Sequence, residues 1–250
     1  MEYNIDDLIK PVFVEERKEV HIPYEFLIKS TVDDCKKLAN KINSSNVTKL
    51  IFNCLYSSNK NKYYDFQILD YIAKEKIEVL SFDNYATQEQ LNGFEHVYFL
   101  ALHLDRANKI NLSSFVNINQ ITLTGFSGDN VIFPKKKSIS IYFYEEGAKT
   151  FNYKIDIEEL ESISFTGFKR IDLSDVLTSI KRMYFYKVKE LRFCKQLKSI
   201  ESLRFEKCNF TQLDTGAIYD MSSLKTITLD KCKYTGELAD LNQNINIEIL

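Results

Sequence analysis

One arrangement of apolar positions recurs along this chain of 250 residues. Apolar residues stand at its first, fourth and sixth positions, and an apolar residue or a cysteine stands at its ninth. The two most regular copies are Ile200, Leu203, Phe205, Cys208 and Leu224, Ile227, Leu229, Cys232. Because one residue separates the fourth position from the sixth, both side chains point to the same face of a strand. The pattern predicts a series of short strands, each with one buried face.

The copies recur loosely along the chain, at intervals that are irregular in the first five copies. Their fourth positions fall at residues 50, 80, 97, 121, 139, 163, 183, 203, 227 and 245, a mean separation of about 22 residues. One strand cannot bury its apolar face alone, but parallel stacking of successive copies closes a continuous core. We therefore expect a single solenoid of about nine to ten repeats over residues 47–250. The expected inward-facing pairs are Leu50/Phe52, Leu80/Phe82, Val97/Phe99, Ile121/Leu123, Ile139/Ile141, Ile163/Phe165, Met183/Phe185, Leu203/Phe205 and Ile227/Leu229.

The two C-terminal copies match the pattern L-x-x-L-x-L-x-x-N/C-x-L, with cysteine in the N/C position and an aromatic residue in the last. On these residues the chain resembles the leucine-rich-repeat family, in an irregular, bacterial-type form. The resemblance covers residues 47–250 and is strongest over residues 197–234. It implies an α/β repeat solenoid with a parallel sheet on the concave side. Short helices or irregular returns would lie on the convex side.

Residues 1–46 are expected to form a helical N-terminal cap. Thr31 is a suitable N-cap for a helix that continues to Asn43. Its apolar face would hold Val32, Cys35, Leu38, Ala39 and Ile42. The spacing of apolar residues predicts a return helix at residues 64–73, and a short helix or 3-10 turn is expected at residues 214–221. Residues 244–250, beginning at Asn244, would form an exposed edge strand, a known position for self-association.

The strand residues that alternate with the buried ones are expected to line the concave face. Many are serine or threonine, while tyrosine and arginine, which are enriched at binding hot spots, gather at two places. The candidate protein-binding residues are His96, Tyr98, Tyr142, Arg182, Tyr184, Tyr186, Arg204, Glu206 and Asp230. The competing interpretation is that hydroxyl side chains solvate the sheet and that tyrosine simply favours strands.

Candidate catalytic groups are few. The chain has three histidines, and none lies at a spacing that suggests a triad. Glu206 and Asp230 occupy the same position on adjacent strands, about 5 Å apart, where they could share a proton, bind a cation or pair with Arg204. We expect pairing with Arg204. The sequence therefore predicts no enzymatic activity, no metal and no cofactor. A hydrolase or metal-dependent enzyme that uses these carboxylates and His96 is the alternative.

Charge and cysteine content narrow the classes of partner. With 33 basic and 35 acidic residues, the net charge of -2 gives no general electrostatic case for nucleic acid or an anionic membrane. The basic run at residues 134–137 is expected to be a solvated loop. Five cysteines without C-x-x-C spacing indicate free thiols in a reducing compartment, with Cys208 and Cys232 stacked as small core residues.

Localisation and function follow from these observations together. No signal-peptide pattern begins the sequence, and its most apolar run, residues 97–104, is too short to cross a bilayer, so a cytoplasmic location is expected. The resemblance implies a non-enzymatic module that binds a partner protein on its concave face. Inhibition by occupancy, as in a bacterial toxin-neutralising immunity protein, is a sharper hypothesis. A surface adhesin or scaffold is the alternative.

Overall fold

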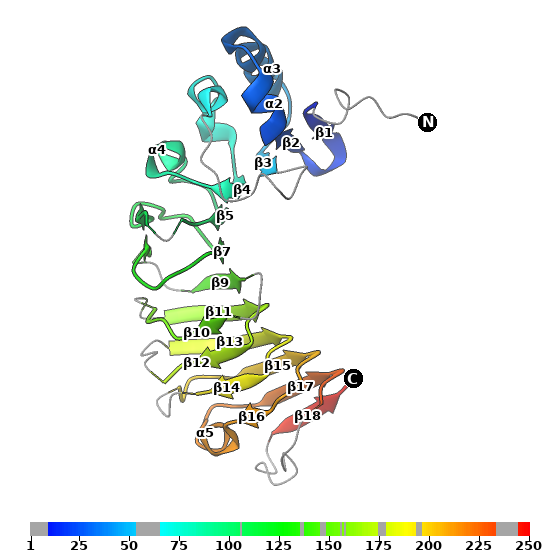
Figure 1. Cartoon of the computed structure of the whole chain (residues 1–250), viewed down its shortest axis with the longest axis vertical. Helices are drawn as coiled ribbons and strands as arrows, with labels where there is room; N and C mark the ends of the chain where they lie inside the picture. Colours follow the sequence, from blue (N-terminus) through cyan, green and yellow to red (C-terminus); the bar gives the residue numbers. More distant parts are fainter. Residues whose placement is uncertain are drawn as a thin grey trace. The chain divides into compact units, whose positions relative to one another are not determined.

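The computed structural model shows a parallel β-solenoid with few helices (Figure 1). It describes residues 10–53, 66–105, 107–135, 138–145, 149–155, 157, 159–174, 179–193, 197–233 and 245–250. The chain divides into two compact units, Met1–Ile121 and Thr122–Leu250. The repeat solenoid predicted from the apolar pattern is confirmed. No helix in the described part of the chain combines the length and apolar character needed to cross a bilayer.

The first unit is built on four parallel strands, β2 (Glu19–Pro23), β3 (Lys49–Asn53), β4 (Val79–Tyr85) and β5 (Phe99–His103). β1 (Val12–Val14) pairs antiparallel with β2. Glu19 pairs with Lys49 and Lys49 with Val79, so the first two turns are equal in length. Val79 pairs with Phe99, and this turn is shorter. The parallel sheet thus begins at Glu19, inside the segment expected to be only a cap.

Helices occupy the long turns of the first unit. α2 (Tyr24–Lys29) and α3 (Val32–Ser44) connect β2 to β3, and η3 (Gln67–Asp70) and η4 (Lys74–Lys76) precede β4. Two further short helices are η1 (Glu15–Arg17) and α4 (Gln88–Leu91), and β6 (Ile110–Asn111) follows β5. β7 (Gln120–Thr124) lies across the boundary between the units.

The helix predicted to begin after the N-cap Thr31 is confirmed as α3. The Thr31 hydroxyl accepts the Asp34 backbone amide, and the Asp34 carboxylate accepts the Thr31 amide at 3.0 Å, which completes a capping box. The α-helix predicted at residues 64–73 is wrong in its described part. Residues Gln67–Asp70 form a single 3-10 turn instead, and residues 64 and 65 lie outside the described residues.

The inward orientation predicted for Phe99, in the copy that contains Val97 and Phe99, is also wrong. Leu100 and Leu102 are buried, whereas Phe99 is only partly covered. In β5 the pairing of Leu80 with Leu100 places Leu100 in the inward row. Because side chains alternate along a strand, a shift of one residue exchanges the two faces. Val97 is buried as predicted, but it lies before the strand begins.

The second unit contains two parallel sheets. One holds β9 (Ile139–Tyr144), β11 (Glu159–Thr166), β13 (Ser179–Tyr186), β15 (Ser202–Glu206), β17 (Thr226–Asp230) and β18 (Asn246–Ile249) in that order. The other, the second sheet, holds β10 (Thr150–Phe151), β12 (Arg170–Asp172), β14 (Glu190–Arg192) and β16 (Gln212–Leu213). β8 (Val131–Ile132) precedes them, and α5 (Thr215–Tyr219) follows β16, where a short helix or turn was predicted. The returns of this unit are therefore mostly strands.

A stack of phenylalanine rings fills the core of the second unit. Phe143, Phe165, Phe185 and Phe205 occupy the same position on successive strands, with ring centroids 5.6, 5.6 and 5.2 Å apart. All four side chains are almost completely buried. In-register parallel pairing places equivalent residues of adjacent strands side by side, so the repeated phenylalanine produces the stack directly.

The strands β11, β13, β15 and β17 each end in a left-handed turn. Gly167 has φ +84°, and a Cβ there would lie 2.0 Å from the Glu145 carbonyl oxygen, so this position requires glycine. In the following turns the equivalent residues are Lys187, Lys207 and Lys231, with φ of 59°, 50° and 51°. β18 is the last strand of the sheet order and falls within the predicted edge strand.

Candidate functional site

Six of the predicted site residues come together on one face of β13, β15 and β17. This face points away from the buried core, and we call it the outer face. The register pairs Arg182 with Ser202, Tyr184 with Arg204, and Tyr186 with Glu206, and it places Glu206 beside Asp230. We name this set the Tyr–Arg cluster. Its members are Arg182, Tyr184, Tyr186, Arg204, Glu206 and Asp230.

The centre of the Tyr–Arg cluster is a network of polar contacts. The Tyr184 hydroxyl donates a hydrogen bond of 2.8 Å to Glu206 Oε2. Arg204 Nη2 lies 3.6 Å from the same carboxylate and 3.9 Å from that of Asp230. The Arg204 guanidinium also lies over the Tyr184 ring, 5.7 Å from its centroid. Each of these side chains is therefore held in one position by its neighbours.

The network shifts the pKa of both hydrogen-bonded partners. Burial, followed by the hydrogen bond to Glu206, raises the pKa of Tyr184. The same hydrogen bond lowers the pKa of Glu206. A carboxylic acid that shares a proton with a neighbouring carboxylate has a raised pKa instead. The contacts of Arg204 with Glu206 and Asp230 thus agree with the predicted ion pairing at this pair of carboxylates.

Tyr186 lies between two lysines at the edge of the cluster. Lys207 Nζ is 3.4 Å from its hydroxyl, and Lys187 and Lys207 lie 5.1 and 5.2 Å from its ring centroid. The hydrogen bond from Lys207 lowers the pKa of Tyr186. Neither lysine was predicted as a site residue, because only the strand positions were compared between copies.

Arg182 is held by a residue that the sequence did not indicate. Its guanidinium forms an ion pair with Glu161, which also accepts a hydrogen bond of 3.1 Å from Lys181. Glu161 lies where the register of β11 shifts between Leu160 and Ser162, so it is an extra residue at a bulge. These side chains line a shallow hollow together with Glu201, Ser202, Lys225 and Thr226.

The remaining predicted residues lie outside the cluster. Tyr142 is on β9, two strands away from β13, and is 36% exposed. His96 and Tyr98 belong to the first unit, and both precede β5, so the prediction that they lie on a strand face is wrong. His96 Nε2 is buried without a hydrogen-bond partner among the described residues.

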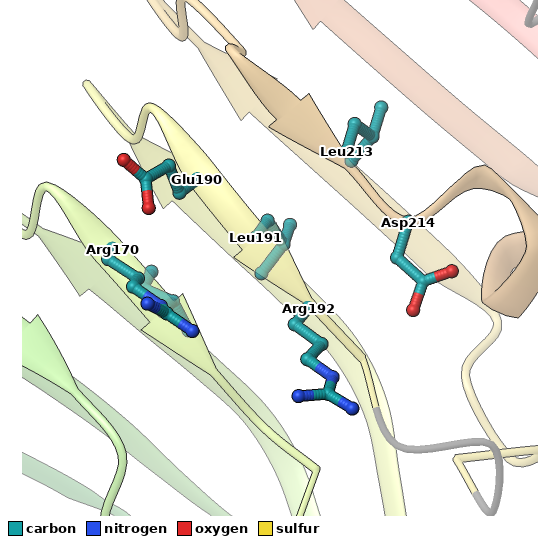
Figure 2. Close-up of a pocket in the computed structure, with 7 residues that line it drawn as sticks. Arg170, Glu190, Leu191, Arg192, Leu213 and Asp214 are labelled. Carbon is teal, nitrogen blue, oxygen red and sulfur yellow. The ribbon is translucent and has the colours of Figure 1, made fainter.

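A second hollow lies on the outer face of the second sheet (Figure 2). Its lining residues are Arg170, Ile171, Glu190, Leu191, Arg192, Leu213 and Asp214. Arg170 and Arg192 lie 3.6 and 4.0 Å from the Asp172 carboxylate. Burial alone would raise the pKa of Asp172, but hydrogen bonds from Ser174 and the two guanidinium groups lower it overall. This hollow was not predicted, because its strands contain only two or three residues.

Cys208 and Cys232 are free thiols, as predicted. Burial raises the pKa of Cys208 to about 12, so its thiol stays protonated at neutral pH. Cys54, Cys194, Lys136 and Lys137 lie outside the described residues. No group of three or more histidine, cysteine, aspartate or glutamate residues in the described ranges could hold a metal ion.

The comparisons with known proteins give no relative. Neither a family model, nor a curated protein, nor a solved structure matches this chain.

Proposed function

We propose that this chain is a non-enzymatic module that binds a partner protein through the outer face of β13, β15 and β17. The observation that carries the proposal is the partly exposed Tyr–Arg cluster, in which Tyr184, Arg204 and Glu206 contact one another. Tyrosine and arginine are the residue types enriched at binding hot spots. Because Tyr184, Arg204 and Glu206 already hold one another, little side-chain freedom would be lost on binding.

The surroundings of the cluster support the same function. The Ser162 hydroxyl donates a hydrogen bond of 2.8 Å to the Ser140 hydroxyl on the neighbouring strand. The Thr226 hydroxyl donates one of 2.9 Å to the Ser202 hydroxyl in the same way. The face is therefore ordered by contacts between its own hydroxyl groups. Surfaces that combine tyrosine anchors with serine hydrogen-bonding groups are typical of protein recognition.

We propose that the repeats are of the leucine-rich-repeat kind. The support is the position of Cys208, which fills the N/C position of its copy and lies 1% exposed. Its thiol donates a weak hydrogen bond of 3.4 Å to the Phe185 carbonyl of the preceding turn. A side chain in this position therefore joins successive turns through the backbone.

The sharper proposal is that binding in the cytoplasm inhibits the partner by occupancy, as an immunity protein neutralises a toxin. Its support is the same ordered face, since a fixed surface that covers an active site inhibits without further chemistry. We favour it over a hydrolase built on Glu206 and Asp230, because Arg204 contacts both carboxylates. A surface adhesin or scaffold would use the same face, but no observation of the structure favours that role.

The test is capture of a partner from the native lysate. The variant Arg182→Ala, Tyr184→Ala, Tyr186→Ala, Arg204→Ala removes the tyrosine and arginine side chains of the cluster. A matched control, Arg170→Ala, Arg192→Ala, Tyr219→Ala, removes exposed side chains of the same types from the second sheet and α5. We expect one dominant protein with the wild type and the control, and loss of that protein with the cluster variant. Equal capture by both variants would refute the proposal.

A further inference from the structure

Lysine side chains gather along the corner between the two sheets of the second unit. Three of them, Lys187, Lys207 and Lys231, directly follow β13, β15 and β17. Another three, Lys149, Lys169 and Lys189, directly precede β10, β12 and β14, and Lys233 pairs with Asn209 of the preceding turn. We name this set the lysine ridge. Its members are Lys149, Lys169, Lys187, Lys189, Lys207, Lys231 and Lys233, and all are exposed.

Backbone hydrogen bonds between turns hold the ridge in register. The amides of Lys187 and Lys207 donate to the carbonyls of Glu206 and Asp230 at 3.0 and 2.8 Å. The amides of Lys169 and Lys189 donate to the carbonyls of Lys149 and Lys169, both at 3.0 Å. Equivalent lysines thus repeat at the strand spacing of about 4.8 Å, and their charges repel one another.

The backbone at this corner is costly for lysine. Lys187, Lys207 and Lys231 all adopt the left-handed conformation, with φ between 50° and 59°. Glycine adopts that conformation without strain and does so at the equivalent Gly167. The same conformation recurs with lysine in three consecutive turns, and Lys18, outside the ridge, adopts it as well.

The charge of the ridge is only partly neutralised. Lys149 pairs with Glu145, Lys207 lies 3.7 Å from Glu206, and Lys231 lies 4.0 Å from Asp230. Among the described residues, no carboxylate forms a salt bridge with Lys169, Lys187, Lys189 or Lys233. The ridge is therefore a local cationic strip on a chain of net charge -2.

The ridge borders the Tyr–Arg cluster directly, because Tyr186, Glu206 and Asp230 each precede one of its lysines in the chain. From β9 to β17 the face measures about 19 Å across and about 16 Å along the strands, or roughly 300 Å² in projection. A standard interface buries about 800 Å² on each partner. A partner with an interface of standard size extends past the cluster, and the ridge lies at the adjoining ends of β13, β15 and β17.

We propose that the lysine ridge binds an acidic segment of the partner protein. This inference rests on the proposed function, since it names the chemistry of the partner beside the cluster. An acidic segment fits better than single-stranded nucleic acid, because base stacking needs free aromatic faces. Lys187 and Lys207 lie over the Tyr186 ring, and Arg204 lies over Tyr184.

The test is a titration of the full chain with three anionic probes at low salt. These are a labelled peptide of ten glutamates, a single-stranded oligo-dT of ten nucleotides, and phosphatidylserine vesicles. The ridge variant is Lys187→Gln, Lys189→Gln, Lys207→Gln. The control variant is Lys37→Gln, Lys109→Gln, Lys198→Gln, which removes the same charge at exposed positions elsewhere. A third variant replaces the same ridge lysines by arginine.

We expect saturable binding of the glutamate peptide, weakened about tenfold or more by the ridge variant and within about threefold of wild type in the control and arginine variants. Binding of oligo-dT or vesicles that is at least as tight would overturn the inference, and so would equal losses in the ridge and control variants. The capture of a partner from the lysate tests the proposed function, and its outcome can be distinguished from that of this titration. A partner that needs the cluster but binds the ridge variant normally would overturn this inference alone.

Discussion

Both units bury one apolar face of a row of parallel strands, but different kinds of return segment cover that face. In the first unit Glu19, Lys49 and Val79 are successive partners, and helices fill the first of these long turns. In the second unit Ser162, Arg182 and Ser202 are successive partners, so the turns are shorter, and the returns between β9 and β17 each contain a strand of two or three residues. The inward apolar pair of each strand is common to both units. The longest turns hold helices, whereas a shorter turn holds either a short helix, as α4 between β4 and β5, or a strand of the second sheet, as β12 and β14.

The largest expected effect lies in the core of the regular unit. Phe185→Ala removes a fully buried ring that stacks between Phe165 and Phe205. We expect the free energy of unfolding to fall by about 3–5 kcal/mol, measured by urea denaturation, with a much smaller loss for Phe185→Leu. A loss below about 1 kcal/mol would show that the ring stack does not hold the short turns together.

The second test compares two turns of the same unit. Gly167→Ala places a Cβ against the Glu145 carbonyl at positive φ, and we expect a loss of about 2 kcal/mol or more. Lys207→Gly relieves the left-handed conformation and should stabilise the chain by about 0.5–1 kcal/mol. Thermal unfolding of both variants measures the difference. Stabilisation by Gly167→Ala, or destabilisation by Lys207→Gly, would contradict the assignment of these turns.

The third test addresses the long turns of the first unit. Thr31→Ala removes the hydroxyl that caps α3, and the expected loss of unfolding free energy is about 1 kcal/mol. Thr31→Ser keeps a capping hydroxyl and should cost only a fraction of this. Equal losses in the two variants would show that the cap does not stabilise the helical return.

The smallest effect is a change in titration within the Tyr–Arg cluster. Tyr184→Phe removes the hydrogen bond that lowers the pKa of Glu206, so that pKa should rise towards its ordinary value of 4.5. A carboxyl group whose pKa is lowered in the folded state stabilises the fold at pH values above its ordinary pKa. This stabilisation is lost as the pH falls through the folded-state pKa. The variant should therefore show weaker pH dependence of stability below about pH 4.5. A carboxyl NMR titration with no change in the Glu206 pKa would contradict the network.

The apolar pattern predicted strands wherever a copy was complete. Leu203, Phe205, Ile227 and Leu229 are buried as expected. The pattern failed at β2, because Val20 and Ile22 are flanked by Arg17 and Glu25 where the template requires apolar residues. In β5 it selected Phe99 instead of Leu100, since consecutive apolar residues do not say which of them faces inward. The second sheet was missed because β10, β12 and β14 each bury a single residue, such as Ile171 or Leu191.

The candidate site was predicted where the register is regular. Tyr184, Arg204 and Glu206 meet because their strands pair without a shift. Glu161 could not be found, since nothing in the sequence marks the bulge that brings it to Arg182. The lysine ridge carried a usable signal. Lysine follows the strand at positions 187, 207 and 231, and an alignment of the polar positions of the copies would have shown it.

The most direct test of the proposed binding face is site-specific photo-crosslinking in the native lysate. A photoreactive residue at Thr228 lies on the outer face beside Arg204, whereas one at Thr150 lies on the second sheet and serves as the control. We predict that Thr228 crosslinks one protein and that this crosslink disappears when Arg182, Tyr184, Tyr186 and Arg204 are replaced by alanine. The same crosslinks from both positions, or none from Thr228, would contradict a binding role for this face.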